Sequence, residues 1–124
     1  MNLNAILSIK PKYVEEIIEG RKIYEYRKCI FKKNVQRVYI YSTYPDKKIV
    51  GYFNFSGYIK DTPQNIWEKT KKYSGIDKKS YDEYFDNRSI GYALNIKKFY
   101  KFKEPLDRSE QRRVGKECPR CVDL

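Results

Sequence analysis

The sequence predicts a small α+β domain, with a curved or barrel-like mixed β-sheet of about five to six strands and two or three short helices. Three observations lead to this prediction. Apolar and polar residues alternate over residues 3–10 and again over residues 90–97, which is typical of strands with one buried face. Two segments between them begin with helix-start signals and continue with an apolar face. The chain of 124 residues is long enough for one domain with its own core.

The N-terminal part predicts a strand, a helix and a second strand. Residues 3–10 alternate between apolar and polar side chains, and Pro11 then opens a helix. The apolar residues of this helix share one face and its acidic residues lie on the other: Tyr13, Val14, Ile17 and Ile18 against Glu15, Glu16 and Glu19. Gly20 is a natural end for the helix, and the second strand is expected over residues 22–28.

The middle of the chain predicts two further strands joined by a turn. Residues 38–42 and 49–59 are rich in β-branched and aromatic side chains, which favour strands. Pro45 and Asp46 are residues that turn the chain between them.

Two helices and a last strand are predicted in the C-terminal half. Thr62 caps a helix whose first residue is a proline, and Gly75 ends it. The inner face of this helix is expected to consist of Ile66, Trp67, Thr70 and Tyr73. A short third helix begins at either Ser80 or Asp77, since both can cap it. Residues 90–96 alternate again and predict a strand that closes the sheet.

The charge of the chain points to a polyanionic partner. There are 27 Lys and Arg against 16 Asp and Glu, a formal net charge of +11. A positive field raises the local concentration of nucleic acids, so RNA or another nucleic acid is the expected partner. Lys, Ile, Tyr and Asn are also the residues of A+T-rich codons, so compositional drift on a solvated surface explains the charge equally well.

Composition also excludes several classes of protein. No run of about 18 apolar residues is present and the N-terminus lacks the regions of a signal peptide, so we expect a cytoplasmic protein without a membrane span. The cysteines, Cys29, Cys118 and Cys121, are odd in number and predict no disulfide framework. The sequence has no histidine, which removes Ser-His-Asp triads and histidine metal sites, and we expect no metal and no cofactor.

Residues 108–124 differ in character from the rest of the chain. They show no apolar periodicity, would not fold by themselves, and resemble the translation of a widely used sequencing-library adapter. We therefore expect a domain over residues 1–107 and a non-native or disordered tail, in which Cys118 and Cys121 carry no function. The tail holds five basic and three acidic residues, so residues 1–107 keep a net charge of +9. On this interpretation the native C-terminus and any following domain are unknown.

The most informative stretch is the motif segment, residues 20–27, which reads Gly-Arg-Lys-Ile-Tyr-Glu-Tyr-Arg. It fits the pattern Gly-x-Lys-x-x-Glu-x-Arg and places a carboxylate between cations on a strand that leaves a glycine turn. Three flanking segments agree with a known pattern: residues 6–13, 40–45 and 49–51. With these flanks the sequence resembles the ASCH family over residues 3–106. The resemblance implies a PUA-like fold and a central cleft that contains the motif lysine, Lys22.

Two interpretations of the motif side chains stay open. Glu25 and Arg27 project from the same face of a regular strand. Arg27 can then hold the Glu25 carboxylate while it accepts from a base edge, or can itself bind a phosphate. The two residues can equally form an ordinary ion pair that braces the sheet. For Lys22 the resemblance favours a role in the cleft over the alternative, capping the carbonyls that end the first helix.

Further candidates come from strand ends and aromatic rings. The strand-end candidates are Ser8, Lys10, Ser42 and Thr43. They are expected where strand ends converge on the cleft, although turn and edge hydrogen bonding is the commoner role of such residues. The candidates for stacking on a base are Tyr26, Tyr44 and Trp67. The spacing of Trp67 fits a buried helix face, so Tyr44, beside a proline turn, is the better of them.

The resemblance also implies a catalytic alternative. Some bacterial relatives look like acetylcytidine amidohydrolases, which use a Lys, a Thr and a Glu, and others are described as ribonucleases. Lys22 matches that lysine, but residue 24 is a tyrosine where the hydrolases have threonine, and their downstream glutamate has no clear counterpart. The acidic residues Asp77, Asp82, Glu83 and Asp86 are interpreted as a solvated face. Cys29 is interpreted as a small apolar filler.

Three functions remain as alternatives. The first is a module that binds RNA and holds a modified or flipped base in the cleft. Its expected contacts are Lys10, Lys22, Glu25, Tyr26, Arg27, Ser42, Thr43 and Tyr44. The second is a hydrolase that acts on RNA or a modified nucleoside, with Lys22 and Glu25 as catalytic residues and the pKa of Lys22 lowered by its surroundings. The third is a small-ligand sensor module of a longer regulator. The oligomeric state is not predicted.

Overall fold

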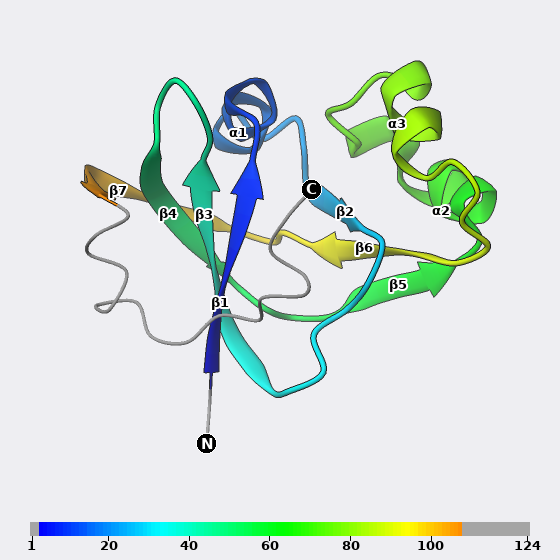
Figure 1. The fold of residues 1–124 in the computed structure, drawn as a ribbon, viewed down its shortest axis with the longest axis horizontal. Helices are drawn as coiled ribbons and strands as arrows, with labels where there is room; N and C mark the ends of the chain where they lie inside the picture. Colours follow the sequence, from blue (N-terminus) through cyan, green and yellow to red (C-terminus); the bar gives the residue numbers. More distant parts are fainter. Residues whose placement is uncertain (1–2, 108–124) are drawn as a thin grey trace.

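The computed structural model describes residues 3–107 of the chain. They form seven β-strands in two sheets, three α-helices and one 3₁₀ turn (Figure 1). The predicted α+β class is confirmed. Two details differ, because there are seven strands rather than five or six, and the described strands do not close into a barrel. The predicted tail, residues 108–124 with Cys118 and Cys121, lies outside the described residues.

The first sheet contains four strands in the order β1-β3-β4-β7. These strands are β1 (Leu3–Ile9), β3 (Val35–Ser42), β4 (Lys48–Asn54) and β7 (Phe99–Asp107). β1 and β3 are parallel, and the chain between them forms helix α1 (Pro11–Ile18) and a strand of the other sheet. The other two pairs of this sheet are antiparallel. Two parallel strands can be joined only by a crossover connection of this kind. Helix α1 and the motif segment both belong to that connection.

The second sheet contains three antiparallel strands in the order β2-β6-β5. Its strands are β2 (Tyr24–Arg27), β5 (Tyr58–Asp61) and β6 (Gly91–Asn95). Helices α2 (Pro63–Thr70) and α3 (Lys78–Tyr84) are joined through the 3₁₀ turn η1 (Lys71–Tyr73) and pack against this sheet (Figure 1). The motif strand β2 is therefore an edge of the second sheet and lies close to both helices.

Side-chain caps fix the starts of α2 and α3. The Thr62 hydroxyl accepts a hydrogen bond from the Asn65 amide at 3.2 Å, and the Asp77 carboxylate accepts from the Ser80 amide at 3.0 Å. Asp77 rather than Ser80 is thus the cap of the third helix. Such caps satisfy amide groups that the helix itself leaves without a partner. No helix within residues 3–107 is long and apolar enough to span a membrane.

Two sequence predictions about the elements were wrong, and one strand was not predicted. The single strand expected over residues 49–59 is two strands in different sheets, β4 and β5, separated at Gly57, whose φ of 133° favours glycine. The strand β7 was not predicted, because its mostly exposed lysines and half-buried rings hide the alternation. Tyr73 does not line the inner face of α2, because that helix ends at Thr70 and Tyr73 lies on the following 3₁₀ turn, 44% exposed.

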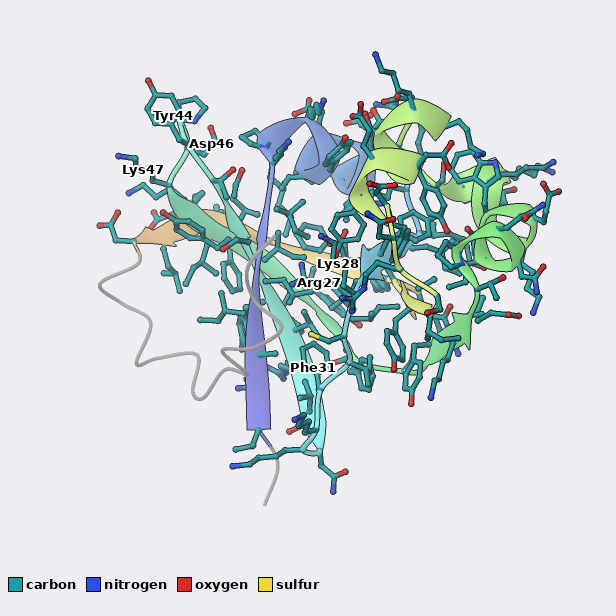
Figure 2. The ribbon with its side chains drawn as sticks, turned by 45° about the vertical axis from the view of Figure 1, so that its right-hand side comes forward. Arg27, Lys28, Phe31, Tyr44, Asp46 and Lys47 are labelled. Carbon is teal, nitrogen blue, oxygen red and sulfur yellow. The ribbon has the colours of Figure 1, made fainter. Side chains whose placement is uncertain are left out.

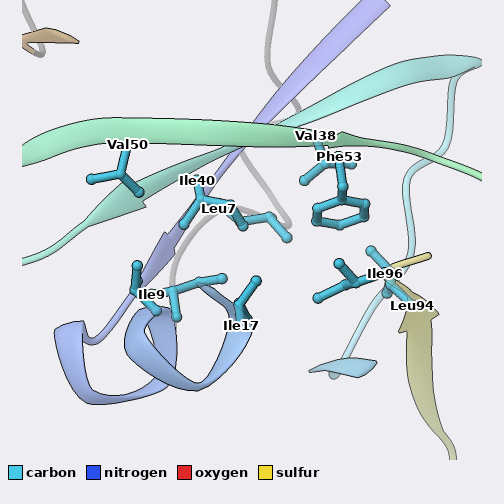
Figure 3. Close-up of a cluster of buried hydrophobic side chains, with 10 residues drawn as sticks. Leu7, Ile9, Ile17, Val38, Ile40, Val50, Phe53, Leu94 and Ile96 are labelled. Atoms are coloured by element: carbon cyan, nitrogen blue, oxygen red, sulfur yellow. The ribbon is translucent and has the colours of Figure 1, made fainter. Parts of the chain in front are cut away.

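The main core lies between the first sheet, helix α1 and strand β6 (Figure 3). Its buried side chains are Leu7, Ile9, Val14, Ile17, Val38, Ile40, Val50, Phe53, Leu94 and Ile96. Each large apolar side chain buried in this way stabilises the fold by about 1.5–3 kcal/mol. Since Leu94 comes from the second sheet and Ile96 directly follows it, this core joins the two sheets into one domain.

A second core holds α2 and α3 on the second sheet. Its buried side chains are Tyr26, Ile66, Tyr81, Phe85 and Ala93. The rings of Tyr26 and Tyr81 meet edge to face with centroids 5.0 Å apart. The hydroxyl of Tyr81 also donates to the Pro63 carbonyl at 2.6 Å, which ties α3 to the start of α2. This packing fixes the position of the motif strand relative to both helices.

We expect Gly51→Ala to destabilise the fold by about 1–3 kcal/mol, because the first sheet has no room for a side chain there. A Cβ at Gly51 would lie 2.3 Å from the Tyr100 carbonyl oxygen and 2.6 Å from the Phe99 ring. Urea denaturation measures the loss. Ser56→Ala, in an exposed loop, is the control and should change the free energy of unfolding by less than about 0.5 kcal/mol. Equal stability of the two variants would contradict the prediction.

Candidate functional site

A cleft of about 350 Å³ opens between helix α1, the motif strand β2 and helix α3. We call it the inner cleft. Its lining residues are Lys10, Lys12, Tyr13, Lys22, Glu25, Tyr26, Ile76, Ser80, Glu83 and Tyr84. Four of the predicted site residues therefore meet here, namely Lys10, Lys22, Glu25 and Tyr26.

The backbone directs the Lys22 side chain into the protein. Gly20 has a φ of 81°, which allows a sharp turn at the end of α1. The Lys22 amide then donates to the Glu16 carbonyl, and the Ile23 amide donates to the Tyr73 carbonyl, both at 3.0 Å. These two bonds hold the start of the motif segment against α1 on one side and the η1 segment on the other. The whole Lys22 residue is 3% exposed.

The Lys22 ammonium has four contacts within the described residues. Its Nζ donates to the Ser74 carbonyl at 2.9 Å and lies 3.9 Å from Glu25 Oε1. It also lies 4.6 Å from the centre of the Tyr26 ring and 5.8 Å from that of Tyr13. Gly75 makes this position possible, because a Cβ there would lie 2.3 Å from the Lys22 Cβ. An ammonium that faces a carbonyl, a carboxylate and a ring is held in place rather than free to move through solvent.

Glu25 and Arg27 complete a buried charge cluster with Lys22. Arg27 Nη1 lies 3.7 Å from Glu25 Oε2, so the carboxylate has one cation on each oxygen. Glu25 is 4% exposed and Arg27 is 2% exposed. Arg27 does not line the inner cleft, whereas Lys22 and Glu25 do. Arg27 thus contacts the Glu25 carboxylate from outside the lining of the cleft.

Burial shifts the pKa of both Lys22 and Glu25, which line the cleft. It lowers the pKa of Lys22 to about 8, although Glu25 and Glu16 act in the opposite direction. It also raises the pKa of Glu25, and the charges of Lys22 and Arg27 offset only part of that shift. Perturbed acid and base groups that face each other in a cleft are typical of functional sites.

Tyr26 forms a wall of the cleft and does not present a free ring face. Its hydroxyl shares a 2.7 Å hydrogen bond with Thr70, whose own hydroxyl donates to the Ile66 carbonyl at 2.8 Å. Tyr26 therefore donates to Thr70, and burial raises the pKa of its phenol to about 12. Tyr26 is only 4% exposed, so its ring contacts the Lys22 ammonium and is not accessible for stacking on a base.

Three predicted residues lie at the β3–β4 turn instead of in the inner cleft. Ser42 is fully buried and donates to Asp46 at 2.8 Å, and the Thr43 amide donates to the Ile9 carbonyl at 3.0 Å. Tyr44 is 76% exposed beside Lys47, at the tip of the turn and well away from Arg27 (Figure 2). The structure therefore places Ser42 and Thr43 in turn bonding and leaves Tyr44 accessible at a separate point.

Three other residues from the sequence analysis are also absent from the lining of the inner cleft. Ser8 is half-buried on β1. Trp67 is half-buried on α2, where its ring lies 4.7 Å from that of Tyr81, as expected for a core residue. Cys29 is half-buried just after the motif strand.

Sequence reasoning missed the wall that α3 and α1 contribute. Glu83 is exposed, as its interpretation as part of a solvated face implies, and it also lines the cleft together with Ser80, Tyr84 and Tyr13. The available signal was the helical spacing of Ser80, Glu83 and Tyr84, which places them on one face of α3. Nothing in the sequence shows that this face turns toward Lys22.

The site offers three amines, two carboxylates and three phenols around a small volume. Lys22 and Glu25 are at its floor, and Glu83 is exposed at its wall. Such a set can hold a polar, planar ligand through charge-assisted hydrogen bonds, and can move a proton between amine and carboxylate. Residues 3–107 contain no group of three or more acidic or cysteine side chains suited to a metal ion.

Sequence comparison relates the chain to known proteins. The sequence model of the ASCH domain matches residues 7–102. A Ureaplasma parvum protein named large ribosomal subunit protein uL22 is 35% identical over 107 residues, which are 85% of this chain and 34% of that protein. A Zymomonas mobilis protein named ASCH domain-containing ribonuclease is 24% identical over 94 residues, which are 75% of this chain and 64% of that protein. The chain thus spans about a third of the length of the uL22 relative.

Solved structures share the fold. The crystal structure of ASCH from Zymomonas mobilis superposes with a TM-score of 0.79 at 20% identity, covering 89% of this chain and 77% of that one. Its S128A mutant gives a TM-score of 0.80 at 20% identity, with coverage of 95% and 84%. The expected PUA-like arrangement is thereby confirmed.

Proposed function

This chain belongs to the ASCH domain family, and we propose that it binds single-stranded RNA with one base held in the inner cleft. The observation that carries the proposal is the buried charge cluster of Lys22, Glu25 and Arg27, of which Lys22 and Glu25 line that cleft. Burying three charges is costly, and apolar residues of similar size often stabilise a protein as well or better. A role in binding gives a reason for the cluster that folding does not.

Each member of the cluster has a distinct proposed role. The Glu25 carboxylate accepts a hydrogen bond from the amino group of a base, while Arg27 fixes its orientation from behind. The Lys22 ammonium donates to a base carbonyl or to a phosphate at the cleft mouth. Tyr84 and Tyr13 give the cleft aromatic walls against which a flat base can pack. These roles require a base that is not paired, as in single-stranded RNA.

The surface charge supports the same proposal. Exposed lysines surround the mouth of the cleft at Lys10 and Lys12, and the chain carries a formal net charge of +11. Contacts of this kind release counterions from RNA and add affinity that does not depend on sequence. The name of the Zymomonas mobilis relative, a ribonuclease, agrees with an RNA ligand.

We expect Lys22→Met to weaken RNA binding by about tenfold, or about 1.4 kcal/mol. The measurement is fluorescence anisotropy of the full chain with a labelled single-stranded RNA, between about 50 mM and 200 mM salt. Wild-type affinity should fall steeply with salt, because much of it comes from phosphate contacts. Methionine keeps the length and packing of the lysine stem while removing its charge.

Lys60→Met is the matched control, since this lysine is exposed on β5 and lies outside the lining of the inner cleft. It should leave the affinity within about twofold of wild type. Equal losses in the two variants would contradict a base-binding cleft. Wild-type protein that fails to bind RNA at low salt would overturn the proposal and favour a small-ligand sensor.

A second candidate function, RNA hydrolysis, is favoured by the lowered pKa of Lys22. With a pKa of about 8, a fraction of Lys22 is a neutral amine at neutral pH and can accept a proton. It would take the proton of a ribose 2′-hydroxyl, whose oxygen then attacks the adjacent phosphorus and displaces the 5′-oxygen. The Lys22 ammonium formed in this way would then return its proton to the leaving 5′-oxygen. Gel analysis of labelled RNA for a 2′,3′-cyclic phosphate product tests this candidate.

An amidohydrolase acting on acetylated cytidine is less well supported by these residues. Residue 24 is Tyr24, half-buried at the start of β2, where the amidohydrolases carry threonine. Glu83 lies at the wall of the cleft and is the described carboxylate best placed to act beside Lys22 and Glu25. Incubation with acetylated cytidine, followed by chromatography, tests this reaction directly.

A further inference from the structure

The inner cleft has a neighbouring hollow with which it shares lining residues. A second hollow of about 670 Å³ adjoins it, and the two share Lys12, Tyr13 and Ile76 as lining residues. We call this second space the outer hollow. Its remaining lining residues are Glu16, Gly20, Arg21, Lys72, Tyr73, Ser74, Gly75 and Asp77. At about 350 Å³ the inner cleft has the size of a small ligand site, so a longer ligand would have to extend into the outer hollow.

One backbone segment forms part of both spaces. The Ser74 carbonyl accepts from Lys22 inside the protein, and Gly75 lies directly against the Lys22 side chain. The neighbouring residue Tyr73 lines the outer hollow and is 44% exposed. A ligand that contacts Tyr73 is therefore held only a short stretch of chain away from the amine in the inner cleft.

Some charged side chains of the outer hollow already bind another group of the protein, whereas two of its lysines form no ion pair with the described residues. Arg21 donates twice to Glu16, at 3.0 and 2.7 Å, and the Asp77 carboxylate caps α3. Lys12 and Lys72 form no ion pair with any of residues 3–107 and are both exposed. The local charge that is left for a ligand is therefore positive, and the group it fits is an anion such as a phosphate.

Each of these lysines lies beside an aromatic ring. Lys12 Nζ is 5.0 Å from the centre of the Tyr13 ring, and Lys72 Nζ is 5.6 Å from the centre of the Tyr73 ring. An ammonium can bind the phosphate of a nucleotide, and a partly exposed ring beside it can stack on the base. Two such pairs around one hollow fit a chain of nucleotides better than a free nucleoside.

We propose that the outer hollow binds the nucleotide adjacent to the one whose base enters the inner cleft. Lys12 and Lys72 contact the phosphate that links the two nucleotides, and Tyr73 stacks on the second base. This inference rests on the proposed function and adds that the ligand is a single-stranded polynucleotide, with affinity that a single nucleoside does not reach.

The test uses the full chain, its Lys12→Ala/Lys72→Ala double variant, and a labelled single-stranded RNA of about six nucleotides. The control double variant is Lys97→Ala/Lys101→Ala, which removes the same charge from exposed positions outside both hollows. We expect the Lys12/Lys72 variant to bind about tenfold more weakly than the control and to reduce the salt slope by about one. Tyr73→Ala should also weaken binding by about tenfold, without changing that slope.

The outcomes separate this inference from the proposed function. If Lys22→Met weakens binding but the two double variants bind equally, the outer hollow is not a nucleotide site and the proposed function stands. If the wild type does not bind the RNA at low salt, both fail. If free nucleosides bind as tightly as the RNA, the polynucleotide inference fails alone. Circular dichroism shows whether each variant keeps the wild-type fold.

Discussion

Glu25→Gln is expected to lower the free energy of unfolding by about 3–5 kcal/mol, because it leaves two buried cations without a buried anion. In the wild type, each Glu25 oxygen has a cation within 4 Å: Lys22 at 3.9 Å and Arg27 at 3.7 Å. All three side chains are at most 5% exposed, so water cannot replace the missing charge. Urea denaturation at neutral pH measures the loss.

Glu83→Gln is the control, since it makes the same chemical change to an exposed carboxylate of the same cleft. It should change stability by less than about 0.5 kcal/mol. The double variant Lys22→Met/Glu25→Gln should be more stable than Glu25→Gln alone, because one of the stranded cations is gone. Two single variants with equal stability would show that the cluster contributes nothing to folding.

The parts of the fold that the sequence predicted are those with local signals. The alternation of residues 3–9 and the proline that starts α1 determine β1 and α1 without reference to the rest of the chain. Strand β7 depends instead on pairing with β4, because its buried and exposed side chains do not alternate regularly along its sequence. The break between β4 and β5 likewise depends on which sheet each half joins.

The candidate site divides in the same way. The strand spacing predicted that Glu25 and Arg27 share one face, and the structure places their charged atoms 3.7 Å apart. It left the direction of Lys22 open, and the structure places the Lys22 ammonium 3.9 Å from the Glu25 carboxylate. The burial of the three side chains and the contact of Lys22 with Glu25 depend on how distant segments pack together, which no local pattern records. For the same reason the exposure of Glu83 was predicted but not its place in the cleft lining, and Tyr44 was grouped with a cleft that it does not line.

Lys22→Met is expected to change how stability depends on pH. The pKa of Lys22 is about 8 in the folded protein and its ordinary value is 10.5. Between these values the unfolded chain binds more protons than the folded one, so this residue makes stability rise with pH over that window. The free energy of unfolding of the wild type, relative to that of Lys22→Met, should therefore rise by on the order of 3 kcal/mol from pH 8 to pH 10.5.

Denaturation curves of both proteins at several pH values measure this gain. Lys60→Met, at an exposed lysine, is the control for effects that replacing any lysine would have. Its free energy of unfolding should differ from that of the wild type by the same amount at each pH. A constant difference for Lys22→Met as well would mean that burial does not lower the pKa of Lys22.

The same titration distinguishes the two candidate functions. Binding of RNA by Lys22 uses the charged ammonium, so affinity should fall as pH rises through about 8. Hydrolysis uses the neutral amine, so the rate at saturating RNA should rise through the same pH and then level off. Lys22→Met should remove whichever of these two pH dependences is seen, because it removes the amine that titrates. An affinity that falls while no product forms identifies a binding module, and a rate that rises identifies an enzyme.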